Sequence, residues 1–107
     1  MNTIPLHYKV IYKNGDRLDI ADFRRTVSGN FIFEYKENPK YLFPGFSPNQ
    51  KKYESNVLWE QIAFRVPNSI RNQFPSVPLE ELLAKTSGRL VTDHFEFILT
   101  TETDTQV

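Results

Sequence analysis

Histidine and carboxylate side chains are the residues of this sequence whose types could support acid–base or metal chemistry. The 107-residue chain has two histidines, His7 and His94, and no cysteine, which excludes disulfides, thiolate metal sites and cysteine nucleophiles. Along a strand, alternation places His94 and Glu96 on one face and Asp93 on the other, so three ligands do not converge. We therefore expect no metal site.

The remaining candidates for catalysis are isolated in the sequence. Glu80 and Glu81 are adjacent, and adjacent positions on a helix do not point at a common atom. Both suit the positive end of a helix dipole instead. The four glycines occur singly, and no serine lies in a nucleophile elbow. We expect no catalytic residue, no cofactor and no enzyme activity.

Length and charge predict one small domain with no strong preference for a charged partner. We assign residues 1–100 to this domain and residues 101–107 to a polar, frayed tail. The chain has 13 Lys and Arg and 13 Asp and Glu, so its net charge is zero. Proteins dedicated to nucleic-acid binding carry an excess of basic residues that neutralise phosphates, so this balance argues against that function. No apolar run approaches the ~20 residues that cross a bilayer, and no signal-peptide pattern opens the chain. We expect a cytoplasmic protein without membrane contact.

The charges are unevenly divided along the chain. Residues 1–53 carry nine basic and five acidic side chains, while residues 54–107 carry four and eight. Two basic pairs, Arg24-Arg25 and Lys51-Lys52, lie near aromatic residues. Basic groups beside aromatic rings are typical of modules that bind single-stranded nucleic acid. A small nucleic-acid-binding module that uses strand aromatics and these pairs is therefore the alternative function, although the zero net charge argues against it.

Alternating apolar residues predict antiparallel strands in the first half of the chain. Residues 6–13 alternate and are followed by Asn14-Gly15, a strong hairpin signal. Leu18 and Ile20 then predict a short return strand. Alternation resumes over residues 31–36. The three prolines of residues 38–50 predict a loop whose aromatic side chains pack on the domain.

The second half shows helical periodicity. Residues from Ser55 to Val66 predict a helix that Ser55 caps and Pro67 stops. Residues 78–85 predict a second helix, and residues 90–100 a last strand. The expected fold is α+β: a small antiparallel β-sheet or partly open barrel with two main helices.

The first of these helices has apolar residues on two sides. Leu58, Trp59 and Ile62 fall in one arc, while Val57 and Phe64 lie opposite, so one sheet cannot cover them all. Tryptophan is a frequent interface anchor because it removes a large area from water. Trp59 also shares its side of the helix with Leu58 and Ile62, as a residue of the hydrophobic core would. Periodicity therefore leaves both roles, interface anchor and core residue, open for Trp59.

Three segments of the chain carry a family resemblance. They are Phe31-Ile32-Phe33-Glu34-Tyr35 with Tyr41-Leu42, then Ser55 to Pro67 followed by Asn68-Ser69-Ile70-Arg71, then Glu81-Leu82-Leu83 leading to Ser87-Gly88-Arg89. In that order they resemble the F-x-Y … W/Y-L strand and loop, the F-F-x-N-L-L-P-D/E-G/S … R segment and the D-L-L … I-G-x-D turn of the first N-terminal subdomain of HipA-type serine/threonine kinase toxins. The chain differs from the family pattern in three ways. Phe64-Arg65-Val66 stands where the family has N-L-L before the proline, and Arg89-Leu90 follows Gly88 where the family has an aspartate after the glycine. The sequence also lacks the body of the kinase.

A lone subdomain of this kind is similar to the HipS antitoxins of tripartite HipBST toxin–antitoxin systems. The resemblance implies an antitoxin that binds and inhibits a HipT-type serine/threonine kinase toxin by supplying in trans its missing N-terminal subdomain. It also implies a ternary complex with a HipB-like helix-turn-helix DNA-binding protein. It favours Trp59 as the partner-binding anchor, with Ser55, Glu60, Ala63 and Phe64 as the surrounding contacts.

Overall fold

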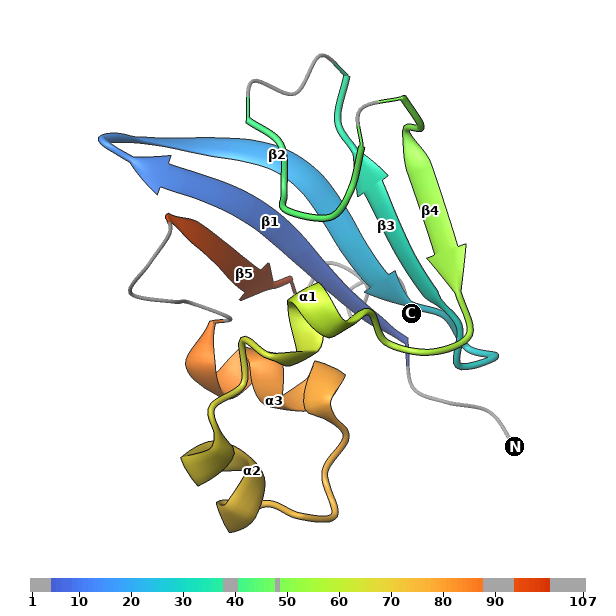
Figure 1. The fold of residues 1–107 in the computed structure, drawn as a ribbon, viewed down its shortest axis with the longest axis vertical. Helices are drawn as coiled ribbons and strands as arrows, with labels where there is room; N and C mark the ends of the chain where they lie inside the picture. Colours follow the sequence, from blue (N-terminus) through green and yellow to red (C-terminus); the bar gives the residue numbers. More distant parts are fainter. Residues whose placement is uncertain (1–4, 38–40, 48, 88–93, 101–107) are drawn as a thin grey trace.

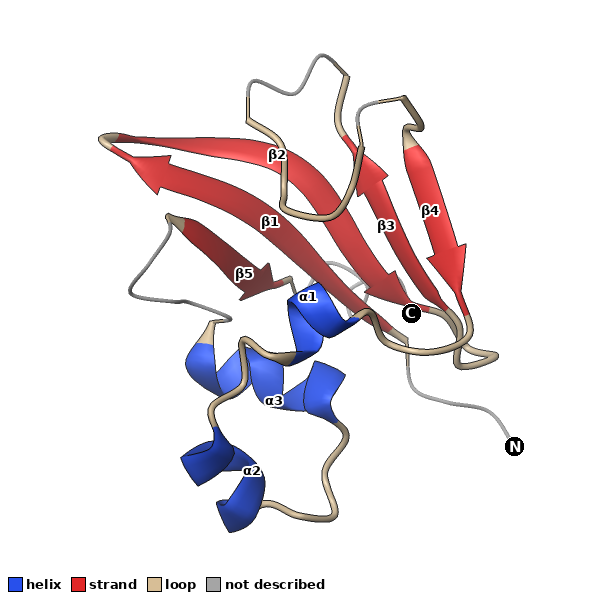
Figure 2. Cartoon of the chain, viewed as in Figure 1, coloured by secondary structure: helices blue, strands red, loops and turns tan. Residues whose placement is uncertain are grey.

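The computed structural model describes residues 5–37, 41–47, 49–87 and 94–100, and it has an α+β fold (Figures 1 and 2). One antiparallel sheet has the strand order β4-β3-β2-β1-β5. The strands are β1 Leu6–Asn14, β2 Asp16–Arg25, β3 Phe31–Tyr35, β4 Lys52–Ser55 and β5 Phe95–Leu99. The helices are α1 Glu60–Ala63, α2 Asn68–Gln73 and α3 Leu79–Thr86. The predicted class is confirmed, and within the described residues the sheet is open, with β4 and β5 at its edges.

One face of the sheet carries the hydrophobic core. Tyr8 on β1 lies opposite Phe23 on β2, and Phe23 lies opposite Phe33 on β3. These three side chains are fully buried, and Ile62 of α1 and Leu82 of α3 complete the core from the helices. Because each aromatic ring buries 150–250 Å², this row stabilises the sheet and fixes its register.

Strand β2 is longer than the short return strand expected from the sequence, because a β-bulge conceals its alternation. The β1–β2 register shifts between Val10 and Ile11. Ile20 and Ala21 are adjacent in the sequence, yet both are buried in the core. The extra residue of the bulge interrupts the alternation between the two faces of the sheet. If odd-numbered residues face the core after the bulge, even-numbered residues face it before the bulge.

The predicted helix from Ser55 to Val66 is wrong over most of its length. Residues 52–55 form the edge strand β4, which pairs with β3. Ser55 therefore caps no helix: its Oγ accepts a hydrogen bond from the Val57 backbone N–H at 3.1 Å. Helix α1 has a single turn, and Trp59 occupies its N-cap position. Pairing with β3 outweighs the local helical period, which is a weak determinant by comparison.

The remaining helices connect α1 to β5. Helix α2, which the sequence analysis missed, begins directly after Pro67. Helix α3 confirms the second predicted helix, but its exit uses Ser87 in the left-handed region, at φ 59°. The expected exit at Gly88, the start of the last predicted strand at residues 90–93 and the predicted tail at 101–107 lie outside the described residues.

The loop of residues 41–47 packs on the core, as the sequence predicts for its aromatic side chains. Phe43 and Phe46 are buried. The Tyr35 hydroxyl donates to the Phe46 carbonyl oxygen at 2.7 Å and accepts from the Phe43 N–H at 3.0 Å. Gly45, at φ +88°, comes so close to α1 that a Cβ there would lie 2.5 Å from Nε2 of Gln61. The loop and α1 are therefore in close contact at Gly45 and the Gln61 side chain.

The opposite face of the sheet carries ion pairs. Asp22 lies 2.8 Å from Nε2 of His7 and 3.0 Å from Nζ of Lys36. Arg24 lies 2.7 Å from the Glu34 carboxylate. These side chains come from β1, β2, β3 and the residue after β3, so the pairs join neighbouring strands.

Acidification is expected to remove the stabilisation that Asp22 provides. Burial alone would raise the pKa of the Asp22 carboxyl, but hydrogen bonds from His7 and Lys36 hold that pKa below its ordinary value. The pKa of an aspartate in the unfolded chain is about 3.9. Because the pKa of Asp22 is lower in the folded protein, its carboxylate stabilises the fold at pH values above about 3.9, and this stabilisation is lost as the pH falls below that value. We expect Asp22→Asn to cost about 1 kcal/mol at pH 7 and progressively less below pH ~4, measured by urea unfolding.

Asp19 is the matched control for this prediction. It also lies on β2, but burial raises the pKa of its carboxyl. A raised carboxyl pKa destabilises the folded protein at neutral pH, so Asp19→Asn should show no loss of stabilisation on acidification. An Asp22→Asn cost that is the same at pH 7 and pH 3 would contradict the assigned role of the ion pairs.

Candidate functional site

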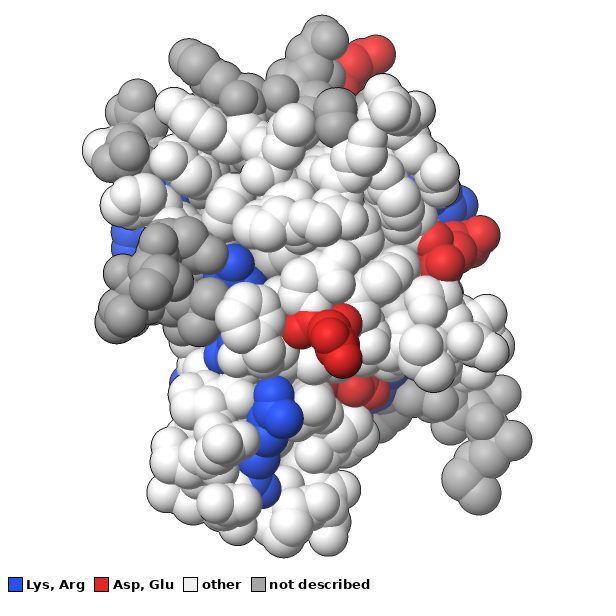
Figure 3. Space-filling model, in the orientation of Figure 1, with Lys and Arg blue, Asp and Glu red and all other residues white. Residues whose placement is uncertain are grey.

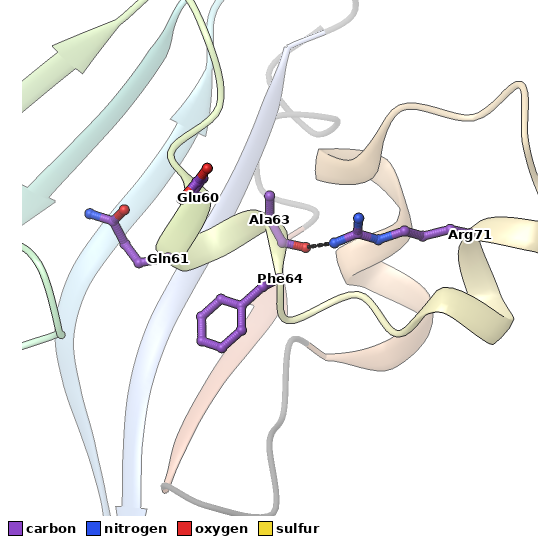
Figure 4. A pocket seen from close by; sticks show the side chains of 5 residues that line it. All are labelled: Glu60, Gln61, Ala63, Phe64 and Arg71. Atoms are coloured by element: carbon purple, nitrogen blue, oxygen red, sulfur yellow. Dashed lines mark hydrogen bonds between the residues drawn. The ribbon is translucent and has the colours of Figure 1, made fainter.

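A hollow of about 490 Å³ lies beside α1 (Figure 4). Its lining residues are Glu60, Gln61, Ala63, Phe64 and Arg71. Glu60, Ala63 and Phe64 share one face because positions three and four apart on a helix are neighbours. Three of the five partner contacts expected from the sequence are thus brought together in one place.

The other two expected contacts, Trp59 and Ser55, are not among the lining residues of this hollow. The half-buried Trp59 ring meets Phe46 edge-on at 5.1 Å between centroids, and Phe23 at 6.4 Å. Ser55 is half-buried at the end of β4. Trp59 therefore supports the core with part of its ring, while the rest of the ring remains at the surface beside the first residue of α1.

Two apolar side chains near α1 are exposed, although Val57 precedes the helix and Phe64 is its C-cap residue. Val57 is 66% exposed and Phe64 is 58% exposed. No other large apolar residue in the described part of the chain is as exposed as these two. A contiguous exposed apolar patch marks a binding surface, and Phe64 is the exposed apolar side chain that borders this hollow.

Arg71 closes one end of the hollow and was missed as a site residue. Its Nη2 donates to the Ala63 carbonyl oxygen at 2.6 Å, and its Nε donates to the Val66 carbonyl oxygen at 2.8 Å. A cation at this end of α1 satisfies carbonyl groups that have no partner within the helix. Arg71 is the arginine of the second resembling segment, but neither spacing nor charge pattern indicates that it bends back onto α1.

The pair Arg24-Arg25 is not an exposed basic patch. Arg24 lies on the ion-pair face of the sheet, whereas Arg25 lies on the core face and is 3% exposed. The Nη1 atom of Arg25 lies 2.8 Å from a carboxylate oxygen of both Glu80 and Glu81. The two glutamates therefore tie α3 to β2, a role beyond the helix-dipole contribution expected from the sequence.

A second, smaller hollow of about 310 Å³ lies where α3 meets the end of β1. Its lining residues are Leu6, Tyr8, Arg25, Glu81, Ala84 and Leu99. The Tyr8 hydroxyl donates to the Glu80 carbonyl oxygen at 2.6 Å, and burial raises the pKa of the Tyr8 phenol well above its usual value. Tyr8 therefore stays protonated and serves as a structural hydrogen-bond donor.

Within the described ranges, no three histidine, aspartate, glutamate or cysteine residues gather as metal ligands. His94 is exposed and meets the ring of Tyr12 edge-on. None of the helices in the described ranges has the length and apolar character required to cross a membrane. The candidate site in the described part of the chain is therefore the surface beside α1, where apolar Phe64 and charged Glu60 and Arg71 line one hollow.

Comparisons of this chain with protein-family models, with curated proteins and with solved structures find no match.

Proposed function

We propose that this protein is a non-catalytic antitoxin that binds and inhibits a HipT-type serine/threonine kinase toxin by supplying its missing N-terminal subdomain in trans. The observation that supports a binding role is the exposed Phe64 at the hollow beside α1. All five lining residues of that hollow belong to residues 55–71, the segment that resembles the helix motif of the HipA subdomain. The surface with the features of a binding site and the family resemblance therefore coincide.

The proposed contact needs an apolar anchor, because association must offset several kcal/mol of lost rigid-body freedom. We assign this role to Trp59 together with Phe64, which follows it by little more than one helical turn. Glu60 and Ala63 lie between them on α1 and form the surrounding contacts. Ser55, on β4, would contact the partner only at the margin of this surface.

The complete assembly that we propose is ternary. A HipB-like helix-turn-helix DNA-binding protein is its third member, as the resemblance implies. DNA contacts would then be made by that protein, with no direct nucleic-acid contact from this chain. We propose a cytoplasmic location for this complex, as expected from the sequence.

The alternative, a nucleic-acid-binding module, has less support. It requires strand aromatics as stacking platforms, but Phe23, Phe33 and Phe97 are buried in the core. It also requires free basic groups, but Arg24 and Arg25 form ion pairs within the protein. Of the two basic pairs, only Lys51-Lys52 is exposed.

Co-expression with a HipT-type kinase tests the proposal, which also predicts that the gene of this kinase lies beside the gene of this protein. We expect the tagged protein to recover the kinase in a stoichiometric complex and to restore the growth of cells that the kinase arrests. Purified alone, it should show no kinase, nuclease or hydrolase turnover. Recovery of nucleic acid without a kinase would instead favour the alternative, and turnover that one point substitution abolishes would overturn the non-catalytic assignment.

A further inference from the structure

We propose that the hollow beside α1 receives an acidic side chain of the protein partner, which binds Arg71 while a neighbouring apolar side chain packs on Phe64. The inference rests on the proposed binding function and specifies the chemistry that this surface recognises. It is carried by three features: the fixed guanidinium of Arg71, the distribution of charge around the hollow and the exposure of Phe64.

The guanidinium of Arg71 is held in place before any partner arrives. Hydrogen bonds from Nε to Val66 and from Nη2 to Ala63 use two of its five N–H donors. Among the described residues, these are the hydrogen bonds that Arg71 makes, so Nη1 has no acceptor there and no carboxylate there forms an ion pair with Arg71. A guanidinium that is already oriented loses little entropy when it binds a carboxylate, which lowers the cost of association.

The charges at the hollow define where an anion can bind. Glu60 is the first residue of α1, whereas Arg71 bonds to the carbonyl group of Ala63, the last residue of α1. Figure 4 shows Glu60 and Arg71 on opposite sides of Ala63, and Figure 3 shows separate acidic and basic patches on this face of the molecule. An acidic group is therefore attracted at the Arg71 end and repelled at the Glu60 end.

The exposed Phe64 side chain makes the proposed ion pair between Arg71 and a partner carboxylate stronger than an ordinary surface ion pair. Phe64 is 58% exposed and lines the same hollow as Arg71. An apolar partner side chain that covers Phe64 would exclude water and lower the local dielectric constant around the ion pair. A single oriented guanidinium suits a carboxylate, whereas a phosphate dianion is usually held by several donors and would be repelled more strongly by Glu60.

Two peptides that differ in one functional group test the inference on the whole protein. The probes are acetyl-Leu-Glu-Leu-amide and its neutral counterpart acetyl-Leu-Gln-Leu-amide, titrated at low salt while the amide resonance of Phe64 and the Nε–H resonance of Arg71 are followed by NMR. We expect both resonances to shift with the acidic peptide, which should bind about fivefold more tightly than the neutral one, a preference that 0.5 M NaCl reduces. Arg71→Met should remove the preference, while Arg17→Gln, which removes an exposed arginine of the β1–β2 hairpin, should retain it.

The result is interpretable even if Arg71→Met fails to fold, because the comparison of the two peptides uses the unaltered protein. Equal binding of both peptides, or no shift at Phe64 and Arg71, would overturn the inference. If that occurs while the kinase is still recovered, the binding function stands and only the acidic ligand is wrong. If the acidic peptide is preferred but no kinase is recovered, the chemistry of the hollow stands and the identity of the partner is wrong.

Discussion

Arg25→Met is expected to destabilise the protein by about 3–5 kcal/mol. Arg25 is 3% exposed and lies 2.8 Å from the carboxylates of Glu80 and Glu81. The Glu80 side chain is 12% exposed. Without the Arg25 guanidinium, its carboxylate is a buried charge that has lost its partner. Removing one partner of a buried ion pair is strongly destabilising for this reason. Glu81 is 41% exposed and can turn toward water, so Glu80 accounts for most of the loss. Urea unfolding at pH 7 measures the effect.

The neighbouring residue provides the matched control. Arg24 also pairs with a glutamate, but both side chains of that pair are about one-third exposed. We expect Arg24→Met to cost no more than about 1 kcal/mol, since solvent screens an exposed pair. The double variant Arg25→Met/Glu80→Leu should recover much of the stability lost by Arg25→Met alone, because an apolar pair of similar size leaves no buried charge. Equal costs for Arg24→Met and Arg25→Met would show that burial does not determine the strength of these pairs.

The contrast between Arg24 and Arg25 also shows what the sequence can and cannot predict. The strands predicted from alternation are present, and the Asn14-Gly15 hairpin joins β1 to β2. Alternation within β2 places Arg25 on the same face as Phe23, so burial of one arginine could have been inferred. Its partners Glu80 and Glu81 lie more than fifty residues away. A contact at that separation depends on how α3 packs on the sheet, which local patterns do not specify.

The helical period between residues 55 and 66 was misleading for a related reason. Ser55 lies opposite Phe31 in the β3–β4 pair, and this long-range pairing determines the conformation up to position 55. The family resemblance nevertheless grouped Glu60, Ala63 and Phe64 as contacts around Trp59, and a single turn at 60–63 is enough to bring these three residues to one hollow. Arg71 was missed because its hydrogen bonds to Ala63 and Val66 depend on the chain reversing after Pro67.

Phe64→Ala is expected to weaken binding to the proposed kinase partner at least 30-fold while leaving the melting temperature almost unchanged. Phe64 is 58% exposed, so its truncation removes little of the surface that folding buries. An aromatic residue at the centre of an interface typically contributes 2 kcal/mol or more to binding, which corresponds to about 30-fold in Kd. Thermal unfolding and a binding titration with the kinase measure the two quantities independently. Leu99→Ala, which shortens an apolar side chain at the smaller hollow, is the control and should leave binding to the kinase unchanged.

Trp59→Ala is expected to affect both stability and binding, because Trp59 contacts the core and the surface at once. Its ring packs edge-on against Phe46 and Phe23 and is half-buried. Truncation of a fully buried tryptophan costs about 3–5 kcal/mol, so a half-buried one should cost about 2 kcal/mol of unfolding free energy. Binding must therefore be measured well below the lowered melting temperature, where the variant is still folded. If Trp59→Ala then binds the kinase as tightly as the unaltered protein, Trp59 is only a core residue and the anchor is Phe64. If Trp59→Ala and Phe64→Ala both bind normally while Leu99→Ala does not, the partner binds at the smaller hollow and the assignment of the site to α1 is wrong.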